Sequence, residues 1–386
     1  MNLTGVVGRL RTKLENGRRI WKTLGQTSIV RILHLNNERG WRGGERQVLL
    51  LAAALQHNGI ANAIACRPGG LLEQRARDAR LPVLSLAGNT IFAAFSLLKA
   101  VSDFDLIHCH TGRTHSIAAA TAFRHHKPII VTRRVDFPPR SSAFNHFKYR
   151  VTSRIVCISQ FIARQLQDWG VTSQKIKVIR SAVLPPTQKS AEPVSKLRGQ
   201  LEVSTDQRIV GNIAALVGHK DHATFLRAAR EIVSKRNDVT FVVIGEGELR
   251  GDLLKLRREL GLENKVHFVG YLPSAEKFLP AFDVFVLSSC MEGLGSVILD
   301  AFAAGVPVAA TAAGGIPELI RDGETGLLAP VGNASALAAA IIRLLDNPVE
   351  AGQFVQRAKS FVADEFSVDQ MAKGYLQVYN EVLSRR

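Results

Sequence analysis

Residues 292–300, EGLGSVILD, combine two acids with two glycines. A short apolar run of the kind that a buried parallel strand uses comes just before them, at 284–287. Ser296 is expected to begin a helix that ends at Gly305. Backbone N–H groups at the start of such a helix point outward along a favourable dipole, and glycines let an anion come close. The segment therefore predicts a phosphate-binding loop.

The two acids indicate what the phosphate would carry. Asp300 lies four residues after Ser296, so the two side chains share one helix face. A carboxylate there can accept paired hydrogen bonds from ribose hydroxyls. Glu292, beside the loop, could hold hydroxyls of the group attached to the phosphate. A nucleotide diphosphate-sugar fits both acids, and a buried strand–loop–helix turn with incidental acids is the alternative.

The wider segment resembles the signature S-x-x-E-G-x-G-x-x-x-L-E-A-x-A-x-G-x-P-V of retaining glycosyltransferases of the GT-B type, glycosyltransferase family 4. The matching residues are Ser288, Glu292, Gly293, Gly295, Leu299, Ala301, Ala303, Gly305, Pro307 and Val308. Asp300 stands where the family usually has its second glutamate. The resemblance implies an α/β protein with two Rossmann-like, doubly wound parallel-sheet domains that face a cleft. It also implies sugar transfer with retention of anomeric configuration.

Further glycine loops follow strand-like runs in the second half of the chain. Lys220 matches the lysine of the family motif G-R-L-x-x-x-K-G, whereas Ala214 or Ala215 occupies the place of its arginine. A lysine there can neutralise a diphosphate, so Lys220 and the amides of Gly293, Leu294, Gly295 and Ser296 are expected to stabilise the leaving group. A solvated helix start is the alternative for Lys220. The resemblance implies more donor contacts, from Gly245, Gly270, Tyr271 and Glu318.

The first half contributes a second set of candidates. The run DLIHCHT at 105–111 resembles a strand end of the family, with His110 expected to emerge at the cleft as a catalytic residue and His108 to be structural. Gly43 and Gly44 lie between the first strand and its helix, where the family often has a Gly-Gly pair near the donor.

Arginines replace an expected histidine in this half. Arg134 stands near the place where many relatives carry a histidine that contacts the donor sugar. Since guanidinium groups bind phosphate in bidentate fashion, an anionic acceptor could be held by Arg113, Arg133, Arg134 and Arg140. A generally basic surface is the alternative.

The charge of the chain is unevenly distributed. Residues 1–190 hold 29 Lys and Arg against 9 Asp and Glu, a net of +20, whereas the remainder holds 21 against 24, a net of −3. A basic excess in one half indicates an anionic acceptor or surface for that half. Nucleic acid is disfavoured because no zinc-finger or aromatic RNA-binding motif occurs and aromatic residues make up only 6%.

No metal site or cofactor is expected apart from the nucleotide-sugar substrate. The DFD run at 103–105 matches the metal–diphosphate signature of a different glycosyltransferase fold, but it precedes a strand and so lies at the wrong end. The four cysteines form no C-x-x-C pair and are expected to be buried thiols, as in a reducing cytoplasm: Cys66, Cys109, Cys157 and Cys290.

At 386 residues the chain is expected to form two domains. Strand–helix alternation predicts two α/β domains, at 28–186 and 187–365, and a final helix at 366–386. A helix is expected at 113–124 and an interdomain linker at 183–193. Strands are expected near 30–35, 60–66, 83–86, 105–109, 128–132, 154–158, 176–180, 208–214, 239–244, 265–269, 283–287, 306–310 and 326–329. The resemblance implies that the first domain binds the acceptor, that the second binds the donor, and that the final helix returns to the first domain. Residues 1–27 form a basic amphipathic extension with Trp21. It could lie on an anionic membrane, or it could pack as a helix or trail as a floppy leader.

The sequence therefore predicts a cytoplasmic or peripheral inner-membrane glycosyltransferase. Its partners would be a nucleotide-sugar donor and a glycan or lipid-linked anionic acceptor of lipopolysaccharide type, with no nucleic acid. Two alternatives stay open. A nucleotide-sugar epimerase uses the same architecture without an acceptor, and a non-enzymatic nucleic-acid-binding protein would use the basic half.

Overall fold

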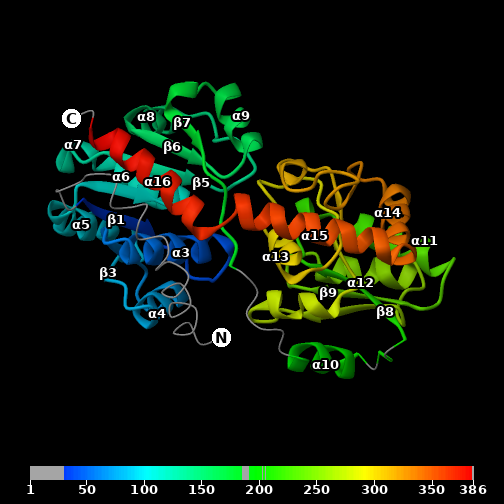
Figure 1. Cartoon of the computed structure of the whole chain (residues 1–386). Coiled ribbons are helices and arrows are strands. Elements are labelled where there is room, and N and C mark those ends of the chain that lie inside the picture. The colour runs from blue at the N-terminus through cyan, green and yellow to red at the C-terminus, as the bar shows by residue number, and fades with distance from the viewer. Residues whose placement is uncertain (1–29, 185–190, 202, 205, 385–386) are drawn as a thin grey trace. The chain divides into compact units, whose positions relative to one another are not determined.

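The computed structural model describes residues 30–184, 191–201, 203–204 and 206–384 (Figure 1). The chain divides into two compact units. Unit 1 contains the described residues up to Ala182 and those from Val368 onward, and unit 2 is Val183–Ser367. The predicted membrane segment at 1–27 lies outside the described residues. No helix in the described ranges is long and apolar enough to cross a bilayer.

Unit 1 is built on a seven-stranded parallel sheet in the order β3-β2-β1-β4-β5-β6-β7. The strands are β1 (Arg31–Asn36), β2 (Ala61–Cys66), β3 (Val83–Ser85), β4 (Leu106–Cys109), β5 (Ile129–Arg133), β6 (Arg154–Cys157) and β7 (Ile176–Val178). The chain runs outward from β1 to β3 and then crosses back to pair β4 with β1. The switch point of this doubly wound sheet, where such folds bind ligands, therefore lies between β1 and β4.

Helices connect these strands, as parallel pairing requires. They are α3 (Gly43–His57), α4 (Leu71–Asp78), α5 (Thr90–Ala100), η2 (Val101–Asp103), α6 (Gly112–Ala120), α7 (Ala122–His125), α8 (Ala143–Val151), α9 (Gln160–Asp168) and η3 (Ser173–Lys175). Helix α16 (Val368–Leu383) also belongs to unit 1, where it packs on α3. The sheet thus gains a covering helix from the far end of the sequence.

Unit 2 repeats the design with six parallel strands in the order β10-β9-β8-β11-β12-β13. These are β8 (Arg208–Ile213), β9 (Val239–Ile244), β10 (Val266–Gly270), β11 (Val284–Leu287), β12 (Val308–Thr311) and β13 (Leu327–Ala329). Its helices are α10 (Ala191–Gln200), η4 (Gly218–Lys220), α11 (His222–Val233), α12 (Arg250–Glu259), η5 (Ala275–Ala281), α13 (Val297–Ala304), η6 (Ile316–Glu318), α14 (Ala334–Asp346) and α15 (Pro348–Glu365). The switch point lies between β8 and β11.

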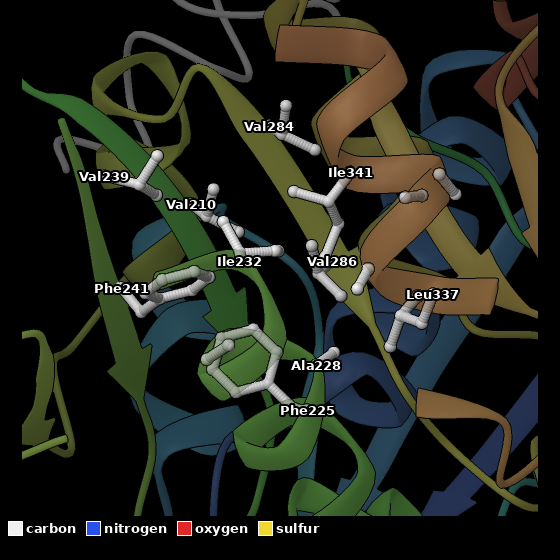
Figure 2. Close-up of a cluster of buried hydrophobic side chains, with 14 of the residues drawn as sticks. Val210, Phe225, Ala228, Ile232, Val239, Phe241, Val284, Val286, Leu337 and Ile341 are labelled. Carbon is white, nitrogen blue, oxygen red and sulfur yellow. The ribbon is translucent and has the colours of Figure 1, made fainter. Parts of the chain in front are cut away.

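A buried apolar cluster holds helices α11 and α14 against one face of this sheet (Figure 2). Phe225 and Ile232 project from α11 toward Phe241 of β9, and the Phe225 and Phe241 rings meet edge to face with centroids 5.8 Å apart. Leu337 and Ile341 come from α14. The apolar cluster lies on the face of the sheet, whereas polar loops follow the carboxyl ends of the strands.

The predicted α/β fold class is confirmed, and each strand expected from the sequence ends within two residues of its observed bounds. Three local predictions are wrong. The helix expected at 113–124 breaks at Thr121, whose φ of −101° and ψ of 2° leave the helical region. Helix α10 begins at Ala191, inside the expected linker, because proline is tolerated in a first helical turn. Gly43 and Gly44 begin α3 instead of preceding it.

The prediction for the cysteines holds for three of the four. Cys66, Cys109 and Cys157 are buried, and burial raises the pKa of Cys66 and of Cys157 to about 12. Cys290 is exposed, contrary to expectation, because it follows β11 in a polar loop instead of lying within the strand.

Candidate active site

The loop between β11 and α13 has the form that the sequence predicts. Ser296 is the N-cap of α13, and Gly305 ends the helix with a φ of 77°, a conformation that glycine adopts without strain. The Leu294 side chain is only 2% exposed, so its burial holds the loop against the core of the unit. Among the described residues, no backbone acceptor takes the N–H groups of Leu294, Gly295 and Ser296. These groups are available to an anion at the helix N-terminus.

The loop after the neighbouring strand brings a lysine to the same place. Strand β8 is followed by the short helix η4, which ends at Lys220. The Lys220 ammonium forms an ion pair with the Glu292 carboxylate, and the two side chains are 19% and 9% exposed. The structure thus joins the two predicted catalytic residues of unit 2 across its switch point. An ammonium has three donor protons, so Glu292 does not exhaust the capacity of Lys220.

Neighbouring groups hold this pair in position. The Ser289 hydroxyl donates to Glu292 Oε1 at 2.9 Å, and the Thr311 hydroxyl donates to the Ser289 carbonyl at 2.5 Å. The Ser288 hydroxyl donates to the Lys220 carbonyl at 3.1 Å. Both sides of the ion pair are therefore tied to residues at the ends of β11 and β12.

The glycines at 314 and 315 permit a close packing of two loops. The Gly315 N–H donates to the Glu292 carbonyl at 2.9 Å. A Cβ on Gly314 would collide with that carbonyl, and a Cβ on Gly315 would collide with the carbonyl of Gly293. Only residues without side chains let this loop support the backbone that carries Glu292.

The remaining predicted donor residues surround this centre in different ways. Gly245 and Gly270 lie at the ends of β9 and β10, where the Gly245 N–H donates to the Gly270 carbonyl at 2.9 Å. The Tyr271 side chain is 62% exposed. Asp300 is half buried in the first turn of α13, and Glu318 is half buried at the end of η6. Their contacts with a nucleotide stay predictions.

In unit 1, the switch point holds three histidines. Register pairs His34 of β1 with His108 of β4, and His110 follows at the end of β4. His34 Nδ1 lies 3.1 Å from His110 Nε2, and the ring centroids of His108 and His110 are 3.9 Å apart. His110 is only 6% exposed. His110 thus lies just after the end of β4, buried beside His34 and Arg134, and its place at a cleft stays a prediction.

Hydrogen bonding determines the proton positions in this cluster. Burial lowers the pKa of His34 to about 3 and holds the pKa of His110 well below its ordinary value, so both rings are neutral at pH 7. Arg134 Nη1 lies 3.4 Å from His110 Nδ1, and a guanidinium can only donate. His110 therefore carries its proton on Nε2 and donates it to His34 Nδ1. The proton of His34 is then on Nε2, which is buried and has no partner among the described residues.

Helix α16 contributes to the same network. His108 Nδ1 lies 2.7 Å from the Tyr379 hydroxyl, and His108 Nε2 lies 2.7 Å from the Thr132 hydroxyl. The Tyr375 hydroxyl lies 2.8 Å from Thr132 Oγ1. His108 is fully buried with both nitrogens bonded, which agrees with its predicted structural role.

The predicted acceptor arginines do not form one cluster. Arg134 joins the histidines, and burial lowers its pKa against the opposing influence of the tyrosines and Glu45. Arg133 donates instead to the Tyr149 hydroxyl at 2.9 Å and to the Phe137 carbonyl. Arg113 donates to the Gly88 carbonyl at 2.6 Å and to the Thr90 hydroxyl at 3.1 Å, and Arg140 is exposed. Consecutive side chains on an extended strand point apart, which separates Arg133 from Arg134.

The three histidines also have nitrogens within 4.8 Å of one another, close enough in principle to share a metal ion. Sequence spacing did not reveal this group, because His34 is far from His108 along the chain. Both nitrogens of His108 are already bonded to hydroxyls, and the Arg134 cation adjoins His110. These contacts disfavour a cation at this point, so the absence of a catalytic metal stays our prediction.

Comparisons with known proteins agree with this geometry. A family model described as glycosyl transferases group 1 matches residues 194–361, and one described as glycosyltransferase family 4 matches residues 41–183. The lipopolysaccharide core biosynthesis glycosyltransferase LpsE of Rhizobium meliloti is 32% identical over 248 residues, which cover 64% of this chain and 68% of LpsE. The chain belongs to glycosyltransferase family 4. It is a glycosyltransferase.

A second relative and two solved structures extend the match over nearly the whole chain. LpsD of Rhizobium meliloti, also named for lipopolysaccharide core biosynthesis, is 26% identical over 364 residues, or 92% of this chain and 100% of LpsD. The crystal structure of Anabaena HepE in complex with UDP and glucose has a TM-score of 0.81 at 22% identity, covering 91% of this chain and 100% of that one. The apo lipopolysaccharide outer core galactosyltransferase WaaB has a TM-score of 0.68 at 15% identity, covering 92% and 100%. The fold is GT-B.

Several residues of this family member's site escaped the sequence reasoning. Ser289 and Thr311 hold Glu292 and the strand end behind it, and His34, Tyr375 and Tyr379 complete the histidine network. The consecutive serines before Glu292 were a usable signal, since hydroxyls after a buried strand often bond a neighbouring carboxylate. No sequence signal points to Tyr375 and Tyr379, because α16 comes next to β4 only when the chain folds.

Proposed function

We propose that this glycosyltransferase uses a nucleotide diphosphate-sugar as its donor and binds it at the switch point of unit 2. The observation that carries this proposal is the Lys220–Glu292 pair beside the amides of Leu294, Gly295 and Ser296, which bond no backbone acceptor in the part of the chain that the structure describes. One ammonium and several N–H groups suit a diphosphate, and a carboxylate suits sugar hydroxyls. HepE, which binds UDP and UDP-glucose, supports the same donor class.

The proposed roles follow from charge and position. The donor diphosphate takes hydrogen bonds from Lys220 and the loop amides, which stabilise the negative charge that develops on the leaving group. Glu292 then orients the sugar, and Asp300 accepts hydrogen bonds from the ribose. His110 is proposed as the catalytic residue that unit 1 contributes. Retention of the anomeric configuration is proposed on the family resemblance, and the transferred group is taken to be a hexose.

The acceptor is proposed to be an anionic glycan or lipid-linked saccharide of the cell envelope. The lipopolysaccharide core names of LpsE and LpsD support this class. The basic excess of residues 1–190 supports an acidic or phosphorylated acceptor on unit 1, with Arg113, Arg133, Arg134 and Arg140 as candidate contacts. The corresponding location is the cytoplasmic face of the inner membrane.

Calorimetric titration with uridine, guanosine and adenosine diphosphate-sugars tests the donor proposal. Wild-type protein should bind one of them saturably, and Glu292→Gln should weaken that binding about ten-fold or more because it removes the charge while keeping the shape. Glu324→Gln changes an exposed acid of the same unit and should bind as wild type does. Folded protein that binds none of the donors would overturn the proposal, and NMR of the product tests retention.

A further inference from the structure

Helix α5 of unit 1 exposes large apolar side chains that nothing in the described structure covers. Ile91, Phe92 and Phe95 are 66%, 64% and 66% exposed, whereas Ala93 and Leu97 are buried on the opposite face. The helix therefore has apolar residues on its outer as well as its inner side, which is unusual for a surface helix. Figure 1 shows α5 at the outer side of unit 1. A contiguous apolar stripe of this kind marks an interaction surface.

Basic groups lie at both ends of this stripe. At the N-terminal end, Arg113 is bonded to the Gly88 carbonyl and to the Thr90 hydroxyl. At the C-terminal end, Lys99 is exposed in the last turn, and Lys127 Nζ lies 3.5 Å from the Ser102 carbonyl of η2. Helices α5, α6 and α7 contain no acid. The exposed Asp103 of η2 lies at the C-terminal end of α5, where the two cations Lys99 and Lys127 outnumber it. The surface therefore combines an apolar centre with a positive border.

A fourth exposed apolar side chain belongs to α7. Phe123 of α7 is 67% exposed, and the Arg124 guanidinium lies 5.7 Å from its ring centroid. The Lys127–Ser102 contact brings the end of α7 next to the end of α5. An aromatic ring with a neighbouring cation is suited to a lipid interface, where the ring meets acyl chains and the cation meets phosphates.

We infer that the α5 stripe, formed by Ile91, Phe92 and Phe95, inserts into the surface of an anionic phospholipid bilayer. The positive border favours anionic headgroups, since each basic residue near such a surface is attracted to it. A second copy of the chain fits less well, because two such borders would repel each other across a self-interface.

The inference rests on the proposed function, because membrane binding would give the enzyme access to the proposed lipid-linked acceptor. Arg113, a predicted acceptor contact, holds the N-terminal turn of α5 and lies in the first turn of α6, the helix that follows His110. Insertion of the stripe would therefore bring Arg113 to the level of the headgroups.

Flotation of the full-length protein with vesicles tests the inference. One vesicle type contains phosphatidylcholine alone and the other also contains phosphatidylglycerol. Phe92→Ala/Phe95→Ala should weaken binding to the anionic vesicles about ten-fold or more, because two rings no longer enter the interface. Lys99→Gln/Arg124→Gln should weaken binding to anionic vesicles only, as should added salt. Val349→Ala, which truncates a side chain 76% exposed on α15 of unit 2, should bind as wild type does.

Unchanged vesicle binding of Phe92→Ala/Phe95→Ala would overturn the inference, and so would conversion of a wild-type dimer to a monomer by that variant in sedimentation velocity. Circular dichroism checks folding, which the truncation of exposed rings should leave intact. Donor titration separates the two proposals. If no donor binds but the phenylalanine variant still loses vesicle binding, the proposed donor fails while the lipid surface stands.

Discussion

Lys220 and Glu292 are oppositely charged side chains removed from most of the solvent and held by hydroxyl groups. Their pairing matters for stability as well as for the proposed donor binding, because too little water reaches the buried carboxylate to replace a lost cation. The proposed donor diphosphate can bind the remaining N–H protons of the same ammonium while the ion pair persists. The two charges are thus positioned before any donor arrives.

Lys220→Met should lower the free energy of unfolding by about 3 kcal/mol, because Glu292 is left charged and largely buried. Urea denaturation measures this value. Lys220→Met/Glu292→Gln should recover more than half of the loss, since it removes the unpaired charge. Lys255→Met, which breaks a pair with side chains 71% and 56% exposed, should cost less than about 1 kcal/mol. Equal effects of the two lysine substitutions would contradict a buried ion pair.

At the scale of elements, the loops after β11 and β12 depend on glycines that let their backbones touch. Gly315 has a φ of −86°, which any residue can adopt, so its requirement is one of space alone. The loop after β12 acts as a support for Glu292.

Gly315→Ala should displace the 292–295 loop, lower donor affinity about ten-fold or more, and destabilise the fold by roughly 1–3 kcal/mol. Calorimetric titration with the nucleotide-sugar that wild type binds measures the affinity, and thermal unfolding measures the loss of stability. Gly352→Ala is the matched control, because a Cβ there meets nothing within 4 Å in helix α15. It should leave donor binding unchanged and stabilise the protein slightly. Donor affinity of Gly315→Ala equal to wild type would show that the loop tolerates movement.

Helix α16 is tied to unit 1 by polar contacts as well as by packing. Tyr375 and Tyr379 are fully buried, and their hydroxyls reach Thr132 and His108. The final helix thereby influences the orientation of residues at the switch point of β1 and β4.

Tyr379→Phe should lower the free energy of unfolding by about 1–3 kcal/mol, because His108 Nδ1 loses its buried partner. Chemical denaturation tests this value, with Tyr271→Phe as a control that alters a tyrosine 62% exposed in unit 2. A Tyr379→Phe protein as stable as wild type would mean that the hydroxyl contributes nothing to holding α16.

For the whole molecule, buried neutral histidines set the response to acid. Burial lowers the pKa of His34 to about 3 and of His222 to about 4, and holds those of His108, His110 and His115 well below 6.5. In the unfolded chain these rings titrate near 6.5, so below that pH the unfolded state binds more protons than the native state. Stability is therefore lost as the pH falls from about 6.5 toward the folded pKa values.

Each such histidine should contribute up to about 1.4 kcal/mol of lost stability per pH unit in this window. Urea denaturation at several pH values between 7.5 and 5 measures the slope. His34→Gln should flatten it, since one protonation site is removed from the unfolded chain. A free energy of unfolding that does not change between pH 6.5 and 5 would contradict the burial of these rings as neutral groups.

The sequence by itself determined the architecture of this protein and the strand–loop–helix segment that carries Glu292. Short apolar runs followed by glycine loops are local signals, and the spacing of Glu292, Gly293, Gly295 and Asp300 specifies a strand, a turn and a helix without outside help. The place of Lys220 after a strand could be predicted for the same reason, and its phosphate contact stays a prediction.

Tertiary structure alone decided which side chains meet. The Lys220–Glu292 pair depends on β8 lying beside β11, and the histidine cluster depends on β1 pairing with β4 in register. The tyrosines of α16 reach that cluster from the end of the chain, and Arg133 and Arg134 part because a strand alternates its side chains. Hydrogen bonds and ion pairs act over a few ångströms in space, whereas sequence patterns report neighbours along the chain, so contacts between distant segments appear only once the chain has folded.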